Sequence, residues 1–398
     1  MENIQLGLKE NWKQFALLVI INAFVGGMIG LERSILPQLA EQVFEIASKT
    51  ALLSFIITFG ITKAVVNYFT GKLANTLGRK KLLILGWLFA LPVPFILIYA
   101  PSWSWIVAAN VLLGINQGLS WSTAVMMKID LVGDKNRGLA VGINEFAGYL
   151  SVGVVAFLTG YIASHYGVRP YPFYLGIGFA IVGLWLSVFF VKDTRQHVSV
   201  ENKASVIPLL ASPFWDTTLR HNSLSAVTQA GLVNNLNDGM IWGLLPLLLL
   251  AKHFTSAQIG ILTAIYPSVW GLSQLVTGRL SDIYSKKGLL FWGMLLQALG
   301  IIGLIWVTTF THFALIGTAL GFGTALVYPT FLSAIADYTP PAQRAESLGT
   351  FRFWRDMGYA VGALLTGVIA DYFGLTMSIF SIGTLTALSA FVVLFRMK

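Results

Sequence analysis

Long apolar runs separated by short polar stretches occupy almost the whole chain. Each run is long enough to cross a bilayer as a helix, which takes about 20 residues, and in lipid the backbone polar groups must pair within the segment itself. The pattern therefore predicts an all-α membrane protein with twelve transmembrane helices, at residues 14–37, 50–70, 82–100, 103–127, 138–163, 172–191, 222–250, 257–277, 288–308, 312–335, 347–369 and 375–395.

The longest polar interruption, residues 192–221, falls in the middle of the chain. We expect it to be a cytoplasmic linker between a six-helix bundle at residues 1–191 and a second six-helix bundle at residues 222–398. Its later part, residues 207–215, is apolar and contains prolines, so we expect that part to lie on the membrane surface.

Composition supports a membrane protein, because 56% of the residues are hydrophobic and only 11% are charged, against roughly 25% charged in average soluble domains. With the N-terminus placed inside, 19 of the 26 Lys and Arg residues, Lys128 among them, fall in inside loops and tails, whereas only Lys49, Arg169 and Lys252 fall outside. Positive charge is typical of cytoplasmic loops. We therefore predict a bacterial inner-membrane protein with both termini in the cytoplasm, and no nucleic-acid partner despite the net charge of +9.

An internal repeat relates the two halves at an offset of 207 residues. Asp130, Arg137 and Gly142 match Asp337, Arg344 and Gly349, and both sets lie between the fourth and fifth predicted spans of their half. Because each half has six spans, both insert in the same orientation, and parallel repeats of this kind hold a solute near the membrane midplane and rock around it. The repeat thus predicts two pseudo-symmetric bundles that transport a solute by alternating access.

The loop after the second span, Gly71-Lys-Leu-Ala-Asn-Thr-Leu-Gly-Arg-Lys-Lys81, resembles the signature of the major facilitator superfamily, and Gly278 to Lys287 is its counterpart in the second half. The resemblance covers essentially the whole chain and implies a cytoplasmic gate made by Gly71, Asn75, Gly78, Arg79, Asp130, Arg137, Gly278, Asp282, Asp337 and Arg344. Asn75 replaces the usual Asp, whereas Asp282 keeps it, so we expect the second-half latch to matter more. The alternative is that the loop only anchors topology.

Eight ionisable residues fall within the predicted spans, where such groups are costly and indicate function: Glu32, Arg33, Lys63, Glu145, Asp238, Arg352, Arg355 and Asp356. Asp238 is the best candidate proton carrier, because it lies at mid-depth beside neutral amides and desolvation favours its protonated form. Glu145 is the second candidate, and Glu32 the third. The alternative for the charges is a structural ion pair between helices, and for Asp238 it is a purely hydrogen-bonded role.

Polar and aromatic side chains on several spans share helix faces that could line a hydrated cavity. Arg352, Arg355, Asp356 and Tyr359 lie at i, i+3, i+4 and i+7, which is one face of a helix. Arg352 can pair with Asp356, which would leave Arg355 for a carboxylate or an anionic solute. The complete predicted cavity set is Lys63, Asn67, Gln117, Trp121, Asn234, Asn237, Tyr266, Trp270, Tyr328, Arg352, Arg355, Asp356 and Tyr359. Helix packing is the alternative for the aromatic members.

These features favour a proton-coupled antiporter that exports a small organic solute. A symporter or exchanger of a small organic anion is the alternative, favoured by Lys63, Arg352 and Arg355, and the fifth span's lack of the proline seen in many exporters also weighs against antiport. A non-transporting sensor or a lipid-handling protein is a third possibility. No nucleophile–base pair, phosphate loop or metal-ligand cluster is present in the sequence, so we expect no enzymatic activity, cofactor or metal. The expected partners are the solute, protons and the lipid bilayer, with the protein a monomer.

Overall fold

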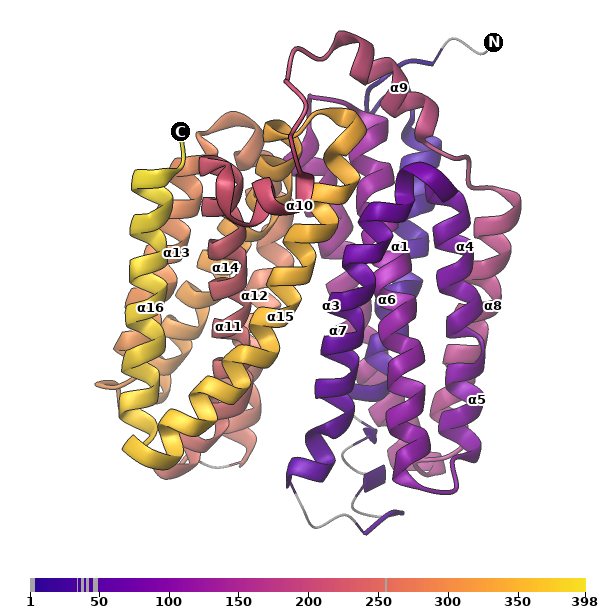
Figure 1. Ribbon diagram of the computed structural model, residues 1–398. Helices are drawn as coiled ribbons and strands as arrows, with labels where there is room; N and C mark the ends of the chain where they lie inside the picture. Colours follow the sequence, from indigo (N-terminus) through magenta and orange to yellow (C-terminus); the bar gives the residue numbers. More distant parts are fainter. Residues whose placement is uncertain (1–3, 34, 37–38, 41–42, 46–48, 255) are drawn as a thin grey trace. The chain divides into compact units, whose positions relative to one another are not determined.

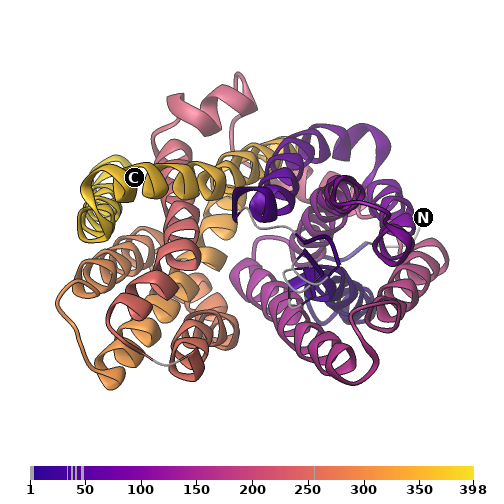
Figure 2. The same cartoon turned by 90° about the horizontal axis from the view of Figure 1, so that it is seen from below.

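The computed structural model describes residues 4–398 except 34, 37–38, 41–42, 46–48 and 255. All regular secondary structure in that part of the chain is helical (Figures 1 and 2). The chain forms two compact units: unit 1 comprises residues 1–135 and 143–205, and unit 2 comprises residues 136–142 and 206–398. The predicted all-α fold of two six-helix bundles is therefore confirmed.

The described residues of unit 1 contain six long helical segments, of which the third is divided in two and the fifth begins with a turn that belongs to unit 2. They are α1 (Trp12–Arg33), α3 (Lys49–Leu77), α4 (Arg79–Ala90) with α5 (Pro92–Tyr99), α6 (Trp103–Val132), α7 (Arg137–Tyr166) and α8 (Tyr174–Phe189), which a 3-10 turn at Tyr171–Phe173 precedes. The break between α4 and α5 falls at Leu91, where Pro92 cannot supply the backbone N–H that a continuous helix needs. The short helix α9 (Arg195–Ala204) follows.

Close contact between helices in unit 1 depends on small residues. A Cβ atom added at Gly26 of α1 would lie 2.2 Å from the carbonyl oxygen of Gly148 in α7. One added at Gly30 would lie 2.6 Å from the carbonyl oxygen of Val152. Only glycine permits these approaches, as is common where membrane helices pack without a hydrophobic driving force.

Unit 2 begins with the short helix α10 (Pro213–Trp215) and a π-helical turn at Asp216–Arg220. Six long helices follow: α11 (Asn222–Ala251), α12 (Ser256–Ile283), α13 (Lys286–Gly303), α14 (Phe310–Tyr338), α15 (Pro341–Phe373) and α16 (Leu375–Arg396). Within this bundle α11 packs against α15, α12 against α14, and α13 against α14 and α16.

The helices extend beyond several of the predicted spans because hydropathy detects only their apolar parts. The fourth span was expected at residues 103–127, but α6 continues to Val132, and the eleventh was expected to begin at residue 347, but α15 begins at Pro341. Lys128 therefore lies inside α6 and is fully buried, so its predicted place in a cytoplasmic loop is wrong. Six segments in the described part of the chain are long and apolar enough to span a membrane on composition alone; α3, α6, α11, α12 and α15 carry most of the polar groups considered next.

Candidate functional site

A buried hydrogen-bonded cluster joins α6 and α7 in unit 1. Trp121 Nε1 donates to Glu145 Oε1 at 2.9 Å, and Asn144 Nδ2 donates to the same oxygen at 2.9 Å. Glu145 and Asn144 are fully buried, and Trp121 is 3% exposed. A carboxylate held by two N–H donors in a membrane helix is well placed for either a proton-carrying or a purely structural role.

Lys128 belongs to the same cluster and was missed as a site residue by the sequence analysis. Its Nζ donates to Asn144 Oδ1 at 2.6 Å and to the carbonyl oxygen of Leu18 at 2.9 Å. Through Asn144 it is linked to Glu145, with which it also interacts electrostatically. The signal was available in the sequence, since Lys128 follows Trp121 by seven residues, which is two helical turns on one face.

Other predicted residues of unit 1 lie near this cluster or pack within the bundle. The Lys63 Nζ lies 5.9 Å from the ring centroid of Trp121, within the range of a cation–π interaction. Ser122 donates to Asn67, and Gln117 Nε2 donates to the carbonyl oxygen of Val25 at 2.9 Å. These two amides therefore hold helices together.

Glu32 is buried near the end of α1, with 4% of its surface exposed. Its role as a proton-carrying group stays a prediction. The side chain of the neighbouring Arg33 lies outside the described residues.

In unit 2, Asp238 of α11 is buried among polar and charged groups from three other helices. The Tyr266 hydroxyl of α12 donates to Asp238 Oδ1, and the same hydroxyl lies 3.1 Å from Thr324 Oγ1 of α14. Arg355 of α15 is close enough to interact electrostatically with the carboxylate. Asp238 thus has a cationic neighbour in the fold that its sequence surroundings did not reveal.

An aromatic series connects Asp238 to the charged face of α15. The ring centroids of Tyr266 and Trp270 are 6.1 Å apart, and those of Trp270 and Tyr328 are 6.0 Å apart. The Arg355 guanidinium carbon lies 4.2 Å from the Tyr328 ring centroid. The structure therefore brings five of the predicted cavity and coupling residues into one cluster, named below the α11–α15 cluster: Asp238, Tyr266, Trp270, Tyr328 and Arg355.

The expectation that Asp356 would leave Arg355 unengaged is wrong. Arg355 Nη1 donates to Asp356 Oδ1 at 3.1 Å, and both side chains are about 5% exposed. The adjacent residues can reach one another because a guanidinium on a long stem bends back over its neighbour. Arg352 is also buried on this helix, and Tyr359 is half-buried.

The two predicted amide residues of α11, Asn234 and Asn237, differ in their hydrogen bonding. Asn237 is bonded within the bundle, donating to Gln297 at 3.2 Å and accepting from Thr386 at 2.7 Å. Asn234, one turn before Asp238, is fully buried, and neither of its amide atoms has a hydrogen-bond partner in the described part of the chain. A buried amide without a protein partner is costly, which is typical of groups that bind water or a ligand.

Gln274 of α12 has the same property and was not predicted. It is fully buried and neither amide atom has a hydrogen-bond partner among the described residues. It follows Trp270 by four residues, so both lie on one face of α12. This spacing could have identified Gln274 from the sequence as a neighbour of Trp270.

The predicted gate residues form matching ion pairs in the two units. In unit 1, Arg79 Nε lies 3.1 Å from Asp130 Oδ2, and both side chains are buried. In unit 2, Lys286 Nζ lies 2.5 Å from Asp337 Oδ2, and Lys286 is 207 residues after Arg79. The two halves therefore share an ion pair at equivalent positions as well as the sequence repeat. Lys286 was not among the predicted gate residues.

The two signature positions Asn75 and Asp282 have different partners. Asn75 Oδ1 accepts from Arg79 Nη1 at 2.9 Å. Asp282 Oδ1 accepts from the backbone N–H of Gly138 at 2.7 Å, and Oδ2 accepts from that of Leu139 at 2.9 Å. The carboxylate therefore binds the unsatisfied N–H groups and positive dipole end of the first turn of α7.

Further contacts in unit 2 hold that same helix turn. Arg137 Nη1 lies 2.5 Å from Asp337 Oδ1. A Cβ atom added at Gly278 would lie 2.6 Å from the carbonyl oxygen of Gly138, so glycine is required at this crossing. Two further gate residues, Gly71 and Arg344, are buried.

Gly78 has a separate requirement for glycine in unit 1. Its φ is +89°, and a Cβ atom there would lie 2.5 Å from Asp193 Oδ2. Asp193 Oδ2 also accepts from the backbone N–H of Lys80 at 3.1 Å. The start of the linker is thereby fixed to the turn that precedes α4.

The sequence profile of the Major Facilitator Superfamily matches residues 15–231 and again residues 227–398. The chain belongs to the Major Facilitator Superfamily. The double match agrees with the two bundles and with the 207-residue repeat. It confirms the family resemblance inferred from the signature loops, and with it a membrane-spanning transporter.

Characterised relatives and a solved structure are consistent with this membership. The proton-coupled antiporter flippase LtaA of Staphylococcus haemolyticus is 23% identical over 379 residues, covering 92% of this chain and 89% of LtaA. LtaA of Staphylococcus saprophyticus is 24% identical, covering 94% and 91%. The crystal structure of the human organic anion transporter MFSD10 superposes with a TM-score of 0.77 at 18% identity, covering 96% and 99%. At that identity the last likeness shows the fold alone.

Proposed function

We propose that this superfamily member is a proton-coupled antiporter that exports a small organic solute by alternating access. The observation that carries the proposal is Asp238, a carboxyl group buried at mid-helix in α11 and hydrogen-bonded by Tyr266. An ionisable group in that position can exchange a proton with one face of the membrane at a time. The description of both LtaA relatives as proton-coupled antiporters supports the same coupling here.

Glu145 is the second proton-carrying group in this proposal. Its carboxylate receives N–H donors from Trp121 and Asn144, and Lys128 is linked to it through Asn144. Loss or gain of a proton at Glu145 would change the charge balance of the cluster, so Lys128 and Asn144 serve as positioning residues. Glu32 is the third carboxyl group of the set.

The solute is held in this proposal by the aromatic side chains of the α11–α15 cluster and by the neighbouring Asn234. Trp270 and Tyr328 offer ring faces for an apolar part of the solute, whereas Asn234 supplies an amide donor and acceptor that have no hydrogen-bond partner among the described residues. A partly apolar organic molecule with hydrogen-bonding groups fits that combination.

A second candidate is a symporter or exchanger of a small organic anion. The observation that favours it is Arg355, which lies over the Tyr328 ring and is buried with Arg352 on the same helix face. A guanidinium in a dry site is suited to binding a carboxylate or phosphate in two-point geometry.

The proposed orientation places both termini in the cytoplasm of a bacterial inner membrane. Its support is the excess of Lys and Arg in the loops on that side. The Asp282 contact with the first turn of α7 then becomes part of a cytoplasmic latch, as the gate residues of the family resemblance imply.

Transport in liposomes tests the coupling and separates the two candidates. A pH gradient is imposed on vesicles containing the purified protein, and uptake of cationic, neutral and anionic organic solutes is followed. In wild type, the gradient should drive accumulation of a cationic or neutral solute. Asp238→Asn should abolish gradient-driven accumulation but leave solute exchange at equal pH intact. Asp371→Asn, at an exposed Asp of the same unit, is the control and should leave both activities unchanged.

Two outcomes would contradict the proposal. Gradient-driven accumulation that is unchanged in Asp238→Asn removes Asp238 from the mechanism. Accumulation of anionic solutes in the direction of proton flow would instead establish the symporter.

A further inference from the structure

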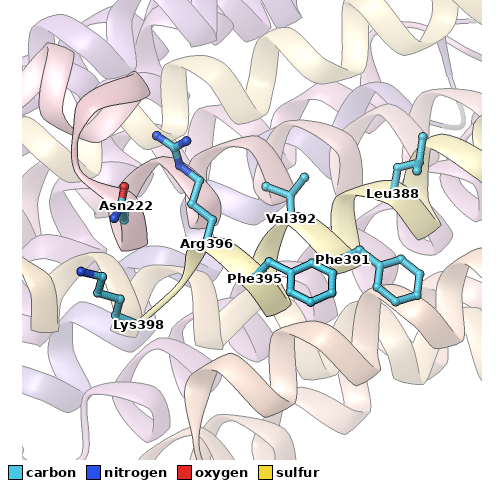
Figure 3. Close-up of a pocket in the computed structure, with 7 residues that line it drawn as sticks. All are labelled: Asn222, Leu388, Phe391, Val392, Phe395, Arg396 and Lys398. Carbon is cyan, nitrogen blue, oxygen red and sulfur yellow. The ribbon is translucent and has the colours of Figure 1, made fainter.

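A pocket of about 630 Å³ lies on the surface of unit 2, where the last turns of α16 approach the start of α11. It is lined by Asn222, Leu388, Phe391, Val392, Phe395, Arg396 and Lys398 (Figure 3). Four of these side chains are apolar and lie along α16, whereas the two cations and the amide gather at its end. None of the transport residues described above belongs to the pocket.

The apolar wall of the pocket consists of exposed side chains on a helix suited to contact acyl chains. Leu388, Phe391 and Phe395 are 57%, 43% and 81% exposed, on a helix that is apolar enough to span the membrane. Eight residues separate Leu388 from Arg396, which corresponds to about 12 Å along the helix axis. One leaflet of the hydrocarbon core is about 15 Å thick, so the wall covers most of the depth of a single acyl chain.

The cationic end of the pocket is held in position by hydrogen bonds. Arg396 Nε donates to Ser225 Oγ at 2.9 Å, and its Nη2 donates to the carbonyl oxygen of Leu219. The backbone of Lys398 is fixed by Ser223, which accepts from its N–H at 3.1 Å, and by Tyr338, which donates to its carbonyl oxygen at 2.6 Å. A guanidinium fixed in this way binds an anion at low entropic cost.

We propose that this pocket binds an anionic glycerophospholipid, with its phosphate against Arg396 and Lys398 and an acyl chain along Leu388, Phe391 and Phe395. Charge complementarity selects the occupant. The pocket lining carries two cations and no carboxylate side chain, so an anionic headgroup gains attraction there, whereas the ammonium of a zwitterionic lipid would face two positive charges. A free phosphate would leave the apolar wall unused, and an uncharged detergent would leave the cations unpaired.

Thermal melting of the purified full-length protein in detergent tests the proposal. Phosphatidylglycerol and phosphatidylcholine with identical acyl chains are titrated separately, and inorganic phosphate is titrated as the headgroup-only probe. The wild type should reach half of its maximal stabilisation at a phosphatidylglycerol concentration at least about tenfold lower than that of phosphatidylcholine. Inorganic phosphate should give no stabilisation in the same concentration range.

Variants assign that preference to the pocket. Arg396→Gln combined with Lys398→Gln should remove the phosphatidylglycerol preference, and Phe395→Ala should weaken the response to both lipids. Lys287→Gln removes a cation of the same unit that does not line the pocket and should leave the preference intact. Because Arg396 also bonds Ser225 and Leu219, Lys398→Gln alone serves as the variant that does not disturb the fold, and it should reduce the preference in part.

Three results would overturn the proposal. The first is a phosphatidylglycerol preference that persists in the double variant. The second is a loss of that preference in Lys287→Gln equal to the loss in the double variant. The third is stabilisation by inorganic phosphate equal to that by phosphatidylglycerol. The last would assign the cations to a free anion rather than to a lipid.

Discussion

Trp121 and Tyr328 occupy equivalent positions of the repeat, 207 residues apart, but they hold charges of opposite sign. Trp121 donates its indole N–H to the carboxylate of Glu145 at 2.9 Å, whereas the Tyr328 ring lies 4.2 Å beneath the guanidinium of Arg355. One pseudo-symmetric fold therefore presents an acidic cluster in unit 1 and a cationic group in unit 2. The repeat thus conserves an aromatic side chain at this position, whereas the charged residue beside it differs between the two units.

Lys128→Met should lower the melting temperature of the purified protein by several degrees. The substitution removes the donor to Asn144 Oδ1 and to the Leu18 carbonyl, and a buried acceptor left without a donor costs about 1–3 kcal/mol. Scanning fluorimetry in detergent measures the change. Lys135→Met, at an exposed Lys seven residues later, is the control and should have no effect; equal melting of the two variants would show that the Lys128 contacts do not stabilise unit 1.

Arg355→Ala should reduce transport of anionic solutes at least about tenfold while affecting neutral solutes much less, since a desolvated charge-assisted contact is worth 1.5–3 kcal/mol. Arg355→Lys should restore only part of the anion transport, because an ammonium cannot form the planar, stacked contact over Tyr328. Initial rates in liposomes provide the measurement. If cationic and anionic solutes lose binding equally in Arg355→Ala, Arg355 has a structural role through its pairing with Asp356.

Asp282→Ala should expose the first turn of α7 to solvent exchange. The carboxylate accepts hydrogen bonds from the Gly138 and Leu139 amides, and each such bond to a charged group contributes about 1.5–3 kcal/mol. Hydrogen–deuterium exchange should therefore become at least about tenfold faster at these two amides. Asn75→Ala, at the equivalent position of the repeat, should leave them unchanged; equal protection in wild type and Asp282→Ala would show that Asp282 does not hold the helix.

Acid should loosen α9 through His197. Burial lowers the pKa of His197 below its ordinary value of 6.5, with Asp130 opposing the shift. Its Nε2 lies 3.3 Å from Asn11 Oδ1, and its Nδ1 is buried without a hydrogen-bond partner in the described part of the chain, so a second ring proton has no acceptor.

Because the pKa of His197 is lower in the folded state, its contribution to stability is complete above pH 6.5 and is lost as the pH falls below that value. Amide exchange in residues 195–204 should therefore accelerate between pH 6.5 and pH 5 after correction for intrinsic rates. His197→Phe should remove the pH dependence. A pH dependence that survives in this variant would assign the effect to another group.

The pattern of apolar residues and the distribution of charge predicted the fold, because a bilayer restricts where apolar and charged side chains can lie along the chain. The all-helical fold and the two-domain repeat were both predictable without coordinates. The ends of α6 and α15 were misplaced, since hydropathy does not register helical turns that carry Lys128 or Arg344. A run of apolar residues identifies the part of a helix that suits lipid. The helix itself ends where its backbone hydrogen bonds end.

The burial of the candidate site residues was predictable from the sequence, but their pairings were not. Charges within spans identified Glu145, Asp238 and Arg355. Spacing alone could not show that Arg355 bonds its neighbour Asp356, or that Arg355 also lies near Asp238 on another helix. Asn237 and Gln117 share helix faces with site residues but form interhelical hydrogen bonds, because the partner of an amide is set by the neighbouring helix rather than by its own.

Proton flux is the most direct test of the central claim, that a buried Asp238 couples proton movement to solute movement. Wild-type protein is reconstituted into liposomes containing a pH-sensitive dye, and a transported solute is added outside at equal pH on both sides. The account predicts a solute-dependent pH change inside the vesicles for wild type and none for Asp238→Asn, while that variant still binds the solute. A pH change of equal size in Asp238→Asn, or solute transport by wild type without any proton movement, would contradict the account.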